Sequence, residues 1–224
     1  MKRPESHRLP FEILYEDRDV IVIDKPAGLL TTHTRLPTRA ARESQRTAEN
    51  ILNDYVRKGQ LKSRAQVWLV HRLDRDTSGV MMFAKSRKVA EYFRSNWNDI
   101  TEKMYLATVE GRMQENSGTF ESNLAEDEDG YMVRSVPKGG KRARTEWKVI
   151  SRGRATTLVE VRLKTGRKNQ IRAHFSEAGH PVVGDVKYGA GTGGPLMLRS
   201  IRLKFALPCG KKVDVSVRSG RRGG

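Results

Sequence analysis

Cysteine is almost absent from this chain of 224 residues, in which Cys209 stands alone. One cysteine cannot form an intramolecular disulfide or build a cysteine-based zinc site. The sequence also has no apolar run long enough to span a bilayer and no Lys/Arg-rich amphipathic helix with a bulky apolar face. Its first residues include no apolar segment of the kind that secretory signal peptides carry. We therefore expect a cytoplasmic protein with no membrane partner.

Acidic residues are scarce relative to basic ones. Asp and Glu number 26 against 43 Lys and Arg, which gives a formal net charge of +17. Net charge says little about fold, but it is informative about partners. An excess of this size favours a polyanion, and nucleic acid is the commonest polyanion.

Motifs for several common chemistries are missing as well. The five histidines form no HxxxH or HxH pair, and no GxSxG segment indicates a serine hydrolase. Gly189, Gly191 and Gly194 match the spacing GxGxxG, but Pro195 and a strand-like run follow where a dinucleotide-binding motif requires a helix. The residues therefore give no support to a metal or dinucleotide site.

Hydrophobic patterning predicts a mixture of strands and helices. Alternation and short apolar runs predict strands within 12–25, at 67–70, 79–85, 103–110 and 155–163, and a hairpin within 196–217. Helices are predicted at 47–58 with Gly59 as the stop, after the capping residue Ser86, and at 170–178. Glycines at 139 and 140 predict that part of the basic stretch 134–154 is flexible. Because strands and helices do not alternate strictly, the pattern favours a mixed α+β domain over a doubly wound parallel sheet.

A dense group of functional side chains separates two of the predicted strands. Residues 71–79 read HRLDRDTSG and contain two carboxylates, two guanidinium groups, an imidazole and two hydroxyls. One interpretation is a charged turn in which Thr77 and Ser78 bond to local backbone. The other is a carboxylate at a strand end that a nearby arginine keeps ionised and nucleophilic. The residues alone leave both interpretations open.

A second group follows a turn glycine, where residues 165–174 read TGRKNQIRAH. Helix N-termini attract anions, and four cationic side chains crowd this one if His174 is charged. The segment is either a solvated basic turn or a phosphate clamp with an arginine pointing inward. Tyr105, in a predicted strand, is either a core aromatic or a ring on which a nucleobase stacks.

These segments, in this order, resemble the RluA family of RNA pseudouridine synthases. The resemblance spans residues 13 to about 205, and HRLDxxTSG is its most specific motif. The four blocks that carry it are Asp24-Lys25-Pro26-Ala27-Gly28-Leu29 with His33; His71-Arg72-Leu73-Asp74 with Thr77-Ser78-Gly79 and Ala84-Lys85; Lys103 with Tyr105-Leu106-Ala107; and Thr165-Gly166-Arg167, Gln170-Ile171-Arg172, His174, Gly179-His180-Pro181, Gly184-Asp185 and Tyr188-Gly189.

The resemblance implies a fold and a reaction. The fold is an α+β domain with a central, mostly antiparallel sheet, flanking helices and a catalytic cleft. The reaction isomerises selected uridines of RNA to pseudouridine: the N-glycosidic bond breaks, the uracil rotates, and it rejoins the sugar through C5. No metal or organic cofactor takes part. The expected partner is ribosomal or transfer RNA, and a monomer is the simplest expectation.

The resemblance also assigns roles by position. Asp74 matches the nucleophile, Tyr105 the ring that packs on the uracil, and Arg172 the partner of Asp74. Arg72 matches the side chain that fills the space left by the extruded base. Attack by Asp74 at C6 of the base and attack at C1′ of the sugar both remain open. The other residues expected to bind RNA or base are Lys25, His71, Thr77, Arg167, Gln170 and His174.

Two positions depart from the family pattern. Asn169 stands where the family usually has histidine, and Arg199 stands where it commonly has histidine in Leu-His-Ala. We expect one catalytic domain over 1–224, with its core at about 13–217, flexible tails at 1–10 and 218–224, and no separate N-terminal RNA-binding domain. RNA selection is then expected from an arginine-rich loop at 35–46 and from the basic stretch 134–154.

Two other classes of function compete with an isomerase. A non-catalytic RNA-binding or ribosome-associated protein would need only the net charge of +17. Such a protein would tolerate Asp74→Asn, whereas the enzyme would lose turnover and keep its RNA affinity. A metal-dependent nuclease would need ligands such as His33, His71, Asp74 and His174, whose spacing does not support a site.

Overall fold

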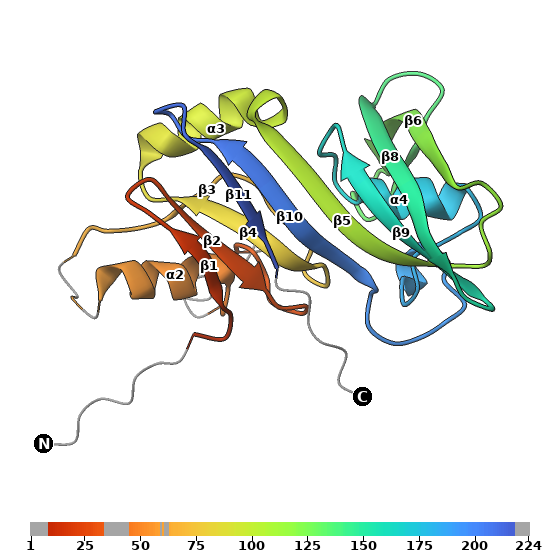
Figure 1. Cartoon of the computed structure of the whole chain (residues 1–224), viewed down its shortest axis with the longest axis horizontal. Helices are drawn as coiled ribbons and strands as arrows, with labels where there is room; N and C mark the ends of the chain where they lie inside the picture. The colour runs from red at the N-terminus through yellow and green to blue at the C-terminus, as the bar shows by residue number, and fades with distance from the viewer. Residues whose placement is uncertain (1–8, 34–44, 59, 61–62, 218–224) are drawn as a thin grey trace, which may run out of the picture.

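The computed structural model describes residues 9–33, 45–58, 60 and 63–217. Its centre is one sheet with the strand order β1-β2-β4-β10-β5-β9-β8-β6-β7, to which β3 adds beside β4 and β11 beside β10 (Figure 1). Paired strands are antiparallel except β4 and β10. The mostly antiparallel α+β fold that the sequence predicts is thus confirmed. The strands are β1 (Ile13–Glu16), β2 (Val20–Lys25), β3 (Trp68–Leu69), β4 (Ser78–Ala84), β5 (Thr101–Glu110), β6 (Ser117–Glu126), β7 (Val133–Ser135), β8 (Lys141–Arg152), β9 (Thr156–Leu163), β10 (Leu198–Ala206) and β11 (Lys212–Ser216).

Helices cover both faces of the sheet. They are α2 (Ala48–Arg57), α3 (Arg87–Ile100), α4 (Gln170–Glu177) and the short 3-10 helix η1 (Val186–Tyr188). Successive strand residues point to opposite faces, so Ile21 joins the core that contains Leu52 of α2 and Phe175 of α4. The next residue, Val22, joins the core that contains Phe93 of α3. Within the part of the chain that the structure describes, no helix is both long and apolar enough to cross a membrane.

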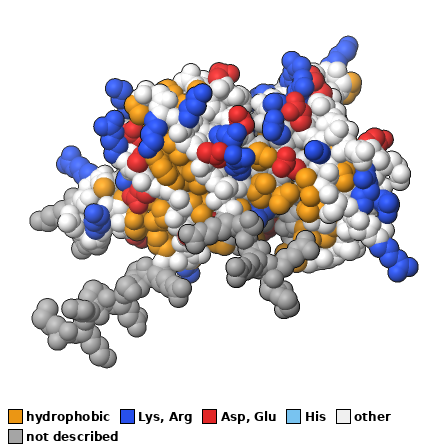
Figure 2. Space-filling model, viewed as in Figure 1, with side chains coloured by type: hydrophobic (Ala, Val, Ile, Leu, Met, Phe, Trp, Pro, Cys, Tyr) orange, Lys and Arg blue, Asp and Glu red, His pale blue; other side chains and the backbone are white. Residues whose placement is uncertain are grey.

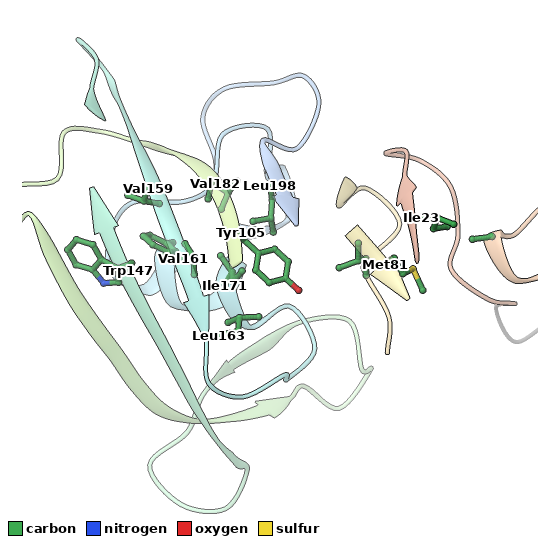
Figure 3. Packing of buried hydrophobic residues seen from close by; sticks show 14 of the residues in the cluster. Ile23, Met81, Tyr105, Trp147, Val159, Val161, Leu163, Ile171, Val182 and Leu198 are labelled. Atoms are coloured by element: carbon green, nitrogen blue, oxygen red, sulfur yellow. The ribbon is translucent and has the colours of Figure 1, made fainter. Parts of the chain in front are cut away.

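The core shared by α2 and α4 has two parts. Figure 3 shows Ile23 and Met81 from the β2–β4 half, and Val161 and Ile171 from the half that includes β9 and α4. The ring of Tyr105, on the central strand β5, lies between the two groups. A central strand therefore carries this aromatic ring to the boundary between the halves of the fold.

The helix caps follow the sequence with one difference. The Ser86 hydroxyl accepts a hydrogen bond from the Val89 backbone N–H at 3.3 Å, which confirms the predicted cap of α3. Helix α2 begins after Thr47, whose hydroxyl accepts from Asn50 N–H. Lys58 caps its C-terminus and takes the left-handed conformation with φ of 51°. The prediction that Gly59 ends this helix is therefore displaced by one residue, and Gly59 itself lies outside the described residues.

The basic stretch 134–154 is more regular than its glycines suggest. Its main part is β8, whose first residues pair with β6 and whose last residues pair with β9. Gly139 and Gly140 have positive φ and lie in the bend that leads into β8. The predicted flexibility concerns this bend and stays a prediction, whereas the charged residues that follow belong to a paired strand. The predicted arginine-rich loop at 35–46 falls mostly on residues 34–44, which lie outside the described residues.

Gly79 of the HRLDxxTSG motif has a structural reason to be glycine. Its φ is +111°, and an added Cβ would lie 1.9 Å from the Ser200 carbonyl oxygen. At this point β4 and β10 form their parallel pairing, with Gly79 opposite Ser200 and Ser78 opposite Arg199. The close contact joins the two strands directly beside the loop that carries Asp74.

Gly79→Ala is expected to lower the free energy of unfolding by at least about 3 kcal/mol, because the methyl group forces β4 away from β10 and the backbone is strained for any L side chain. Denaturant unfolding of the variant measures this loss. Gly189→Ala is a matched control, because Gly189 also has positive φ but has open space around it. Equal losses in the two variants would show that backbone strain, rather than the strand contact, explains the glycine.

Candidate active site

An open cavity of about 490 Å³ lies where the loop before β4, strand β5 and the start of α4 meet. The two segments rich in functional side chains, 71–79 and 165–174, both line it. Of the predicted site residues, those that line the cavity are Asp74, Tyr105, Arg172, Arg72, His71, Thr77, Arg167 and Gln170. Two others, Lys25 and His174, do not line it. Residues that are far apart in the sequence thus share one concave surface.

The loop that carries Asp74 is held by the Asp24-to-Leu29 block. The Lys25 side chain is fully buried, and its ammonium donates to the carbonyl oxygens of Pro26, Leu29 and Arg75 at 2.7–2.9 Å. The backbone N–H of Gly28 donates to the same Arg75 carbonyl at 3.0 Å. These bonds saturate the three donors of the ammonium. Lys25 therefore positions the loop, and the expectation that it contacts RNA is revised.

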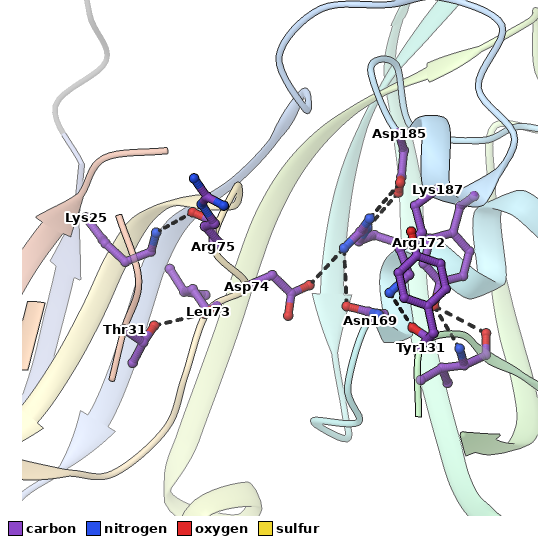
Figure 4. Close-up of polar contacts among 12 residues, drawn as sticks. Lys25, Thr31, Leu73, Asp74, Arg75, Tyr131, Asn169, Arg172, Asp185 and Lys187 are labelled. Carbon is purple, nitrogen blue, oxygen red and sulfur yellow. Dashed lines mark hydrogen bonds and ion pairs between the residues drawn. The ribbon is translucent and has the colours of Figure 1, made fainter. Parts of the chain in front are cut away.

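Asp74 faces Arg172 across the cavity. Its side chain is 27% exposed, and its Oδ2 lies 3.5 Å from Nη1 of Arg172 (Figure 4). The two residues come from the loop before β4 and from α4, and 98 positions separate them in the chain. The expected pairing of the two side chains is present, but at a long distance.

The principal partner of Arg172 is Asp185. Nε and Nη2 of Arg172 each donate to one carboxylate oxygen of Asp185 at 2.6 Å, and the Asp185 side chain is only 1% exposed. Burial alone would lower the pKa of Arg172, but the hydrogen bonds and charge of Asp185, with a contribution from Asp74, raise it above its ordinary value. The guanidinium is therefore a fixed cation whose third nitrogen points toward Asp74.

Asn169 and Tyr188 also contact Arg172. Nη1 of Arg172 donates to Oδ1 of Asn169 at 3.3 Å, and its guanidinium carbon lies 4.9 Å from the centre of the Tyr188 ring. Asn169 adopts a left-handed conformation with φ of 51°, which asparagine tolerates better than most residues. The departure from the family pattern at this position thus places an amide oxygen on the arginine that faces Asp74.

Tyr105 enters the cavity from β5 with its side chain 7% exposed. Burial raises the pKa of its hydroxyl above the ordinary value, and the nearby charge of Asp74 raises it further. The phenol is therefore protonated at neutral pH. A neutral ring beside a carboxylate can pack on a planar base, and its hydroxyl can exchange a proton without first ionising.

His71 has a structural partner on each side. Its Nε2 accepts a hydrogen bond from the Met82 backbone N–H at 3.0 Å, and its ring stacks on Trp97 at a centroid distance of 4.5 Å. Burial and the charge of Lys103 lower the pKa of His71 to about 3. This imidazole is neutral and is used as an acceptor inside the fold, so it fixes the start of the loop.

Gln170 and His174 form the interior of α4. Gln170 is 2% exposed; it accepts from Thr165 Oγ1 and Arg167 N–H and donates to the Arg144 carbonyl and Thr145 Oγ1, at 2.8–3.0 Å. His174 is 3% exposed and contacts the Thr145 hydroxyl at 2.8 Å. Burial lowers the pKa of His174, which disfavours the charged form that would add a fourth cation to this segment. Gln170 holds the TGR turn from inside.

Two predicted RNA contacts, Arg72 and Arg167, remain accessible to a ligand, and a third, Thr77, is buried in the cavity wall. Arg72 is exposed at the cavity rim, and Arg167 is partly exposed with its Nε bonded to the Arg142 carbonyl at 3.0 Å. Thr77 lines the cavity, and its buried hydroxyl oxygen has no hydrogen-bond partner among the described residues. Lys and Arg side chains are spread over the visible face in Figure 2, with fewer acidic side chains among them.

Arg199, the second departure from the family pattern, lies in a different network. Its Nη2 donates to Oδ2 of Asp24 at 2.6 Å, and its Nη1 lies 3.4 Å from the Ser78 hydroxyl. The side chain thus joins β10 to β2 and β4 next to Gly79. Arg199 therefore stabilises the sheet and does not line the cavity.

Sequence reasoning missed three residues of this site. Asp185 was noted only as part of a motif, although a lone acidic residue in the apolar run PVVGDV is a signal of a buried charge pair. Lys103 and Asn169 were noted without a role. Among the described residues, no three His, Cys, Asp or Glu side chains are grouped so that they could hold a metal ion.

Comparison with known proteins places this geometry in a family. A family model described as RNA pseudouridylate synthase matches residues 19–177. The uncharacterized RNA pseudouridine synthase YjbO of Bacillus subtilis is 38% identical over 182 residues, which cover 81% of this chain and 62% of that protein. The dual-specificity RNA pseudouridine synthase RluA of Vibrio vulnificus is 32% identical over 187 residues, 80% of this chain and 70% of that protein.

The chain spans 58–62% of the length of the first three curated relatives. A solved structure, human RNA Pseudouridylate Synthase Domain Containing 4, superposes with a TM-score of 0.75 at 23% identity over 94% of this chain and 89% of the human chain. The likeness to this human structure shows that the two chains share a fold. Together with the family match, it confirms the resemblance that the four motif blocks predicted, and the chain belongs to the RluA family of RNA pseudouridylate synthases.

Proposed function

We propose that this chain is an RNA pseudouridine synthase, an isomerase that converts selected uridines of ribosomal or transfer RNA to pseudouridine with Asp74 as its nucleophile. The observation that carries the proposal is the meeting of Asp74, Tyr105 and Arg172 in one cavity of about 490 Å³. The net charge of +17 supports RNA as the partner.

The reaction needs a nucleophile that stays ionised and a cavity that accepts a single flipped nucleotide. Arg172 is a fixed cation beside Asp74, so it favours the carboxylate over the carboxylic acid. The uridine enters after unstacking, which costs a few kcal/mol. Arg72 at the rim occupies the space that the base leaves, and the Tyr105 ring packs against the uracil inside.

The bonds change in a fixed order around Asp74. An oxygen of Asp74 attacks the nucleoside at C6 or at C1′, and the bond from N1 to C1′ breaks. The uracil rotates and C5 bonds to C1′. The oxygen of Asp74 leaves as a free carboxylate, from C1′ when C5 takes its place or from C6 afterwards. The C5 proton leaves to a base in the cavity, and N1 takes up a proton, so the product is an isomer of the substrate. The isomerisation is redox-neutral, so side chains alone suffice for it and no cofactor is proposed. The Tyr105 hydroxyl, in the lining of the same cavity, is the group proposed to pass on the C5 proton.

Tyr105→Phe keeps the ring and removes this hydroxyl. We expect the turnover rate to fall by about 10²-fold or more, as for a lost general acid–base group, while RNA affinity stays unchanged because the stacking surface remains. Turnover at saturating RNA and equilibrium binding separate the two effects. Full turnover by Tyr105→Phe would limit Tyr105 to packing.

Tritium release from RNA labelled with [5-³H]uridine tests the proposed function, because the reaction exchanges the hydrogen at C5. Bulk ribosomal RNA and bulk transfer RNA are assayed separately, with and without EDTA. Release from one class that is insensitive to EDTA identifies the reaction and the class of substrate. Binding of both classes without release from either would support a non-catalytic RNA-binding protein, and strand cleavage that EDTA abolishes would support a nuclease.

A further inference from the structure

Two lysines are buried in the described part of the chain, and they differ in what holds their charge. Lys25 is fully buried, and three carbonyl oxygens saturate its ammonium. Lys103 is 5% exposed, and a single oxygen, Oδ1 of Asn98, accepts a hydrogen bond from its Nζ at 3.1 Å. No carboxylate of the described residues lies within ion-pair distance of Lys103. A buried ammonium normally has such partners.

The surroundings of Lys103 are aromatic and basic. Its Nζ lies 5.8 Å from the centre of the Trp97 ring, and the neutral imidazole of His71 stacks on the same tryptophan. Arg94 and Arg167 line the same cavity as Lys103, and the charge of Arg167 acts directly on it. The cavity lining therefore includes three permanent or potential cations, Lys103, Arg94 and Arg167.

We propose that Lys103 binds a phosphodiester of the RNA strand, next to the uridine whose base lies on Tyr105. The inference rests on the proposed function for the placement of the base. The phosphate would supply the negative partner that the protein itself does not give to Lys103, and Arg167 and Arg94 would share the charge.

The spacing on β5 suits one nucleotide. Lys103 and Tyr105 are two positions apart, so they point to the same face of the strand, and their backbones are about 7 Å apart. A single nucleotide can therefore place its base on Tyr105 and its phosphate against Lys103. Arg172 is already paired with the buried Asp185, so its charge is not available for this phosphate.

Because Lys103 is buried, RNA binding at the proposed phosphate site should depend on pH. Burial and the charge of Arg167 lower the pKa of Lys103 to about 8. The group binds phosphate only as an ammonium, so its contribution to RNA affinity is present at pH 7 and is lost as the pH rises through about 8 and above. Of the other groups that face Lys103, His71 is neutral in this range, since its pKa is lowered to about 3, and both arginines stay charged.

Three variants, each combined with Asp74→Asn to prevent turnover, test this site with a short oligouridylate as the probe. Lys103→Met keeps the aliphatic packing on Trp97 and removes the charge. Lys103→Arg keeps a charge that does not titrate. Lys88→Met is the matched control, because Lys88 is exposed on α3. Thermal melting first confirms that each variant is folded, and affinity is then measured against salt and pH.

We expect Lys103→Met to weaken binding about tenfold at pH 7, as for one lost charge-assisted contact. The slope of log K against log salt should fall by about 0.7, the value for one phosphate contact of a single strand. The loss of affinity between pH 7 and pH 9 should be smaller in Lys103→Met and in Lys103→Arg than in the parent, and any remaining loss is expected from Lys25, whose pKa burial also lowers to about 8. Lys88→Met should bind within about twofold of the parent with the same pH dependence.

An unchanged affinity and salt slope in Lys103→Met would overturn the phosphate site, and so would an alkaline loss as large in Lys103→Met as in the parent. Tritium release separates this failure from failure of the proposed function. If the wild type releases tritium and Lys103→Met binds normally, only the phosphate site fails. If no RNA class releases tritium, the proposed function fails, whereas the oligouridylate measurements still decide whether Lys103 binds phosphate.

Discussion

Asp74→Asn is expected to abolish tritium release from labelled RNA, with a fall in turnover of at least about 10⁴-fold, as for the loss of other enzyme nucleophiles. The amide has nearly the same shape as the carboxylate but cannot attack carbon. RNA affinity should stay the same or rise, because the change removes a negative charge from a surface that meets a polyanion. Rapid mixing at saturating RNA gives the turnover, and filter binding gives the affinity.

The neighbouring carboxylate provides a control. Asp76 is exposed in the same loop and lines a separate hollow beside Asp185 rather than the cavity with Tyr105. Asp76→Asn should keep turnover within a few-fold of the wild type. If Asp74→Asn turned over as fast as Asp76→Asn, the assignment of the nucleophile would be wrong.

Arg172→Ala is expected to lower the free energy of unfolding by about 3–5 kcal/mol, because it leaves the carboxylate of Asp185 buried without a cation. Asp185 is 1% exposed and takes two hydrogen bonds of 2.6 Å from the arginine. The change also removes the cation beside Asp74, so turnover should fall as well. Urea unfolding and tritium release measure the two effects.

An exposed ion pair is the control for this effect. Arg202 and Asp214 bond to each other with side chains that are 40% and 45% exposed, and Arg202→Ala should change the free energy of unfolding far less than Arg172→Ala does, because solvent screens this pair. The double variant of Arg172→Ala and Asp185→Asn should recover part of the stability, since no unpaired charge is then buried, and it should remain inactive. A stable and fully active Arg172→Ala protein would contradict the assignment of Arg172.

Much of the fold could be predicted because its signals are local. Alternation in 155–163 corresponds to β9, the polar turn near Asp17 separates β1 from β2, and Ser86 caps α3. Strand β8 was missed because it is paired on both edges in the interior of the sheet while its sequence is dominated by charged residues. Pairing of a strand with two neighbours depends on tertiary contacts, so no local pattern in the sequence predicts it.

The sequence predicted which residues form the site better than it predicted which contacts they make. The motif blocks identified Asp74 and Arg172, but the arginine is bonded more closely to Asp185 than to Asp74. The expected RNA contacts Lys25 and His174 instead hold the loop and the helix from inside. A sequence shows which side chains are present, whereas the partner that neutralises a buried charge depends on how segments about a hundred residues apart meet.

The most direct test of the central claim is the nucleoside composition of RNA after the reaction. RNA is incubated with the wild type or with Asp74→Asn, digested to nucleosides, and separated by chromatography that resolves uridine from pseudouridine. If Asp74 is the nucleophile of an isomerase, the wild type forms one pseudouridine for each tritium released from C5 and Asp74→Asn forms none. Tritium release without pseudouridine, or equal pseudouridine from Asp74→Asn, would contradict isomerisation through Asp74.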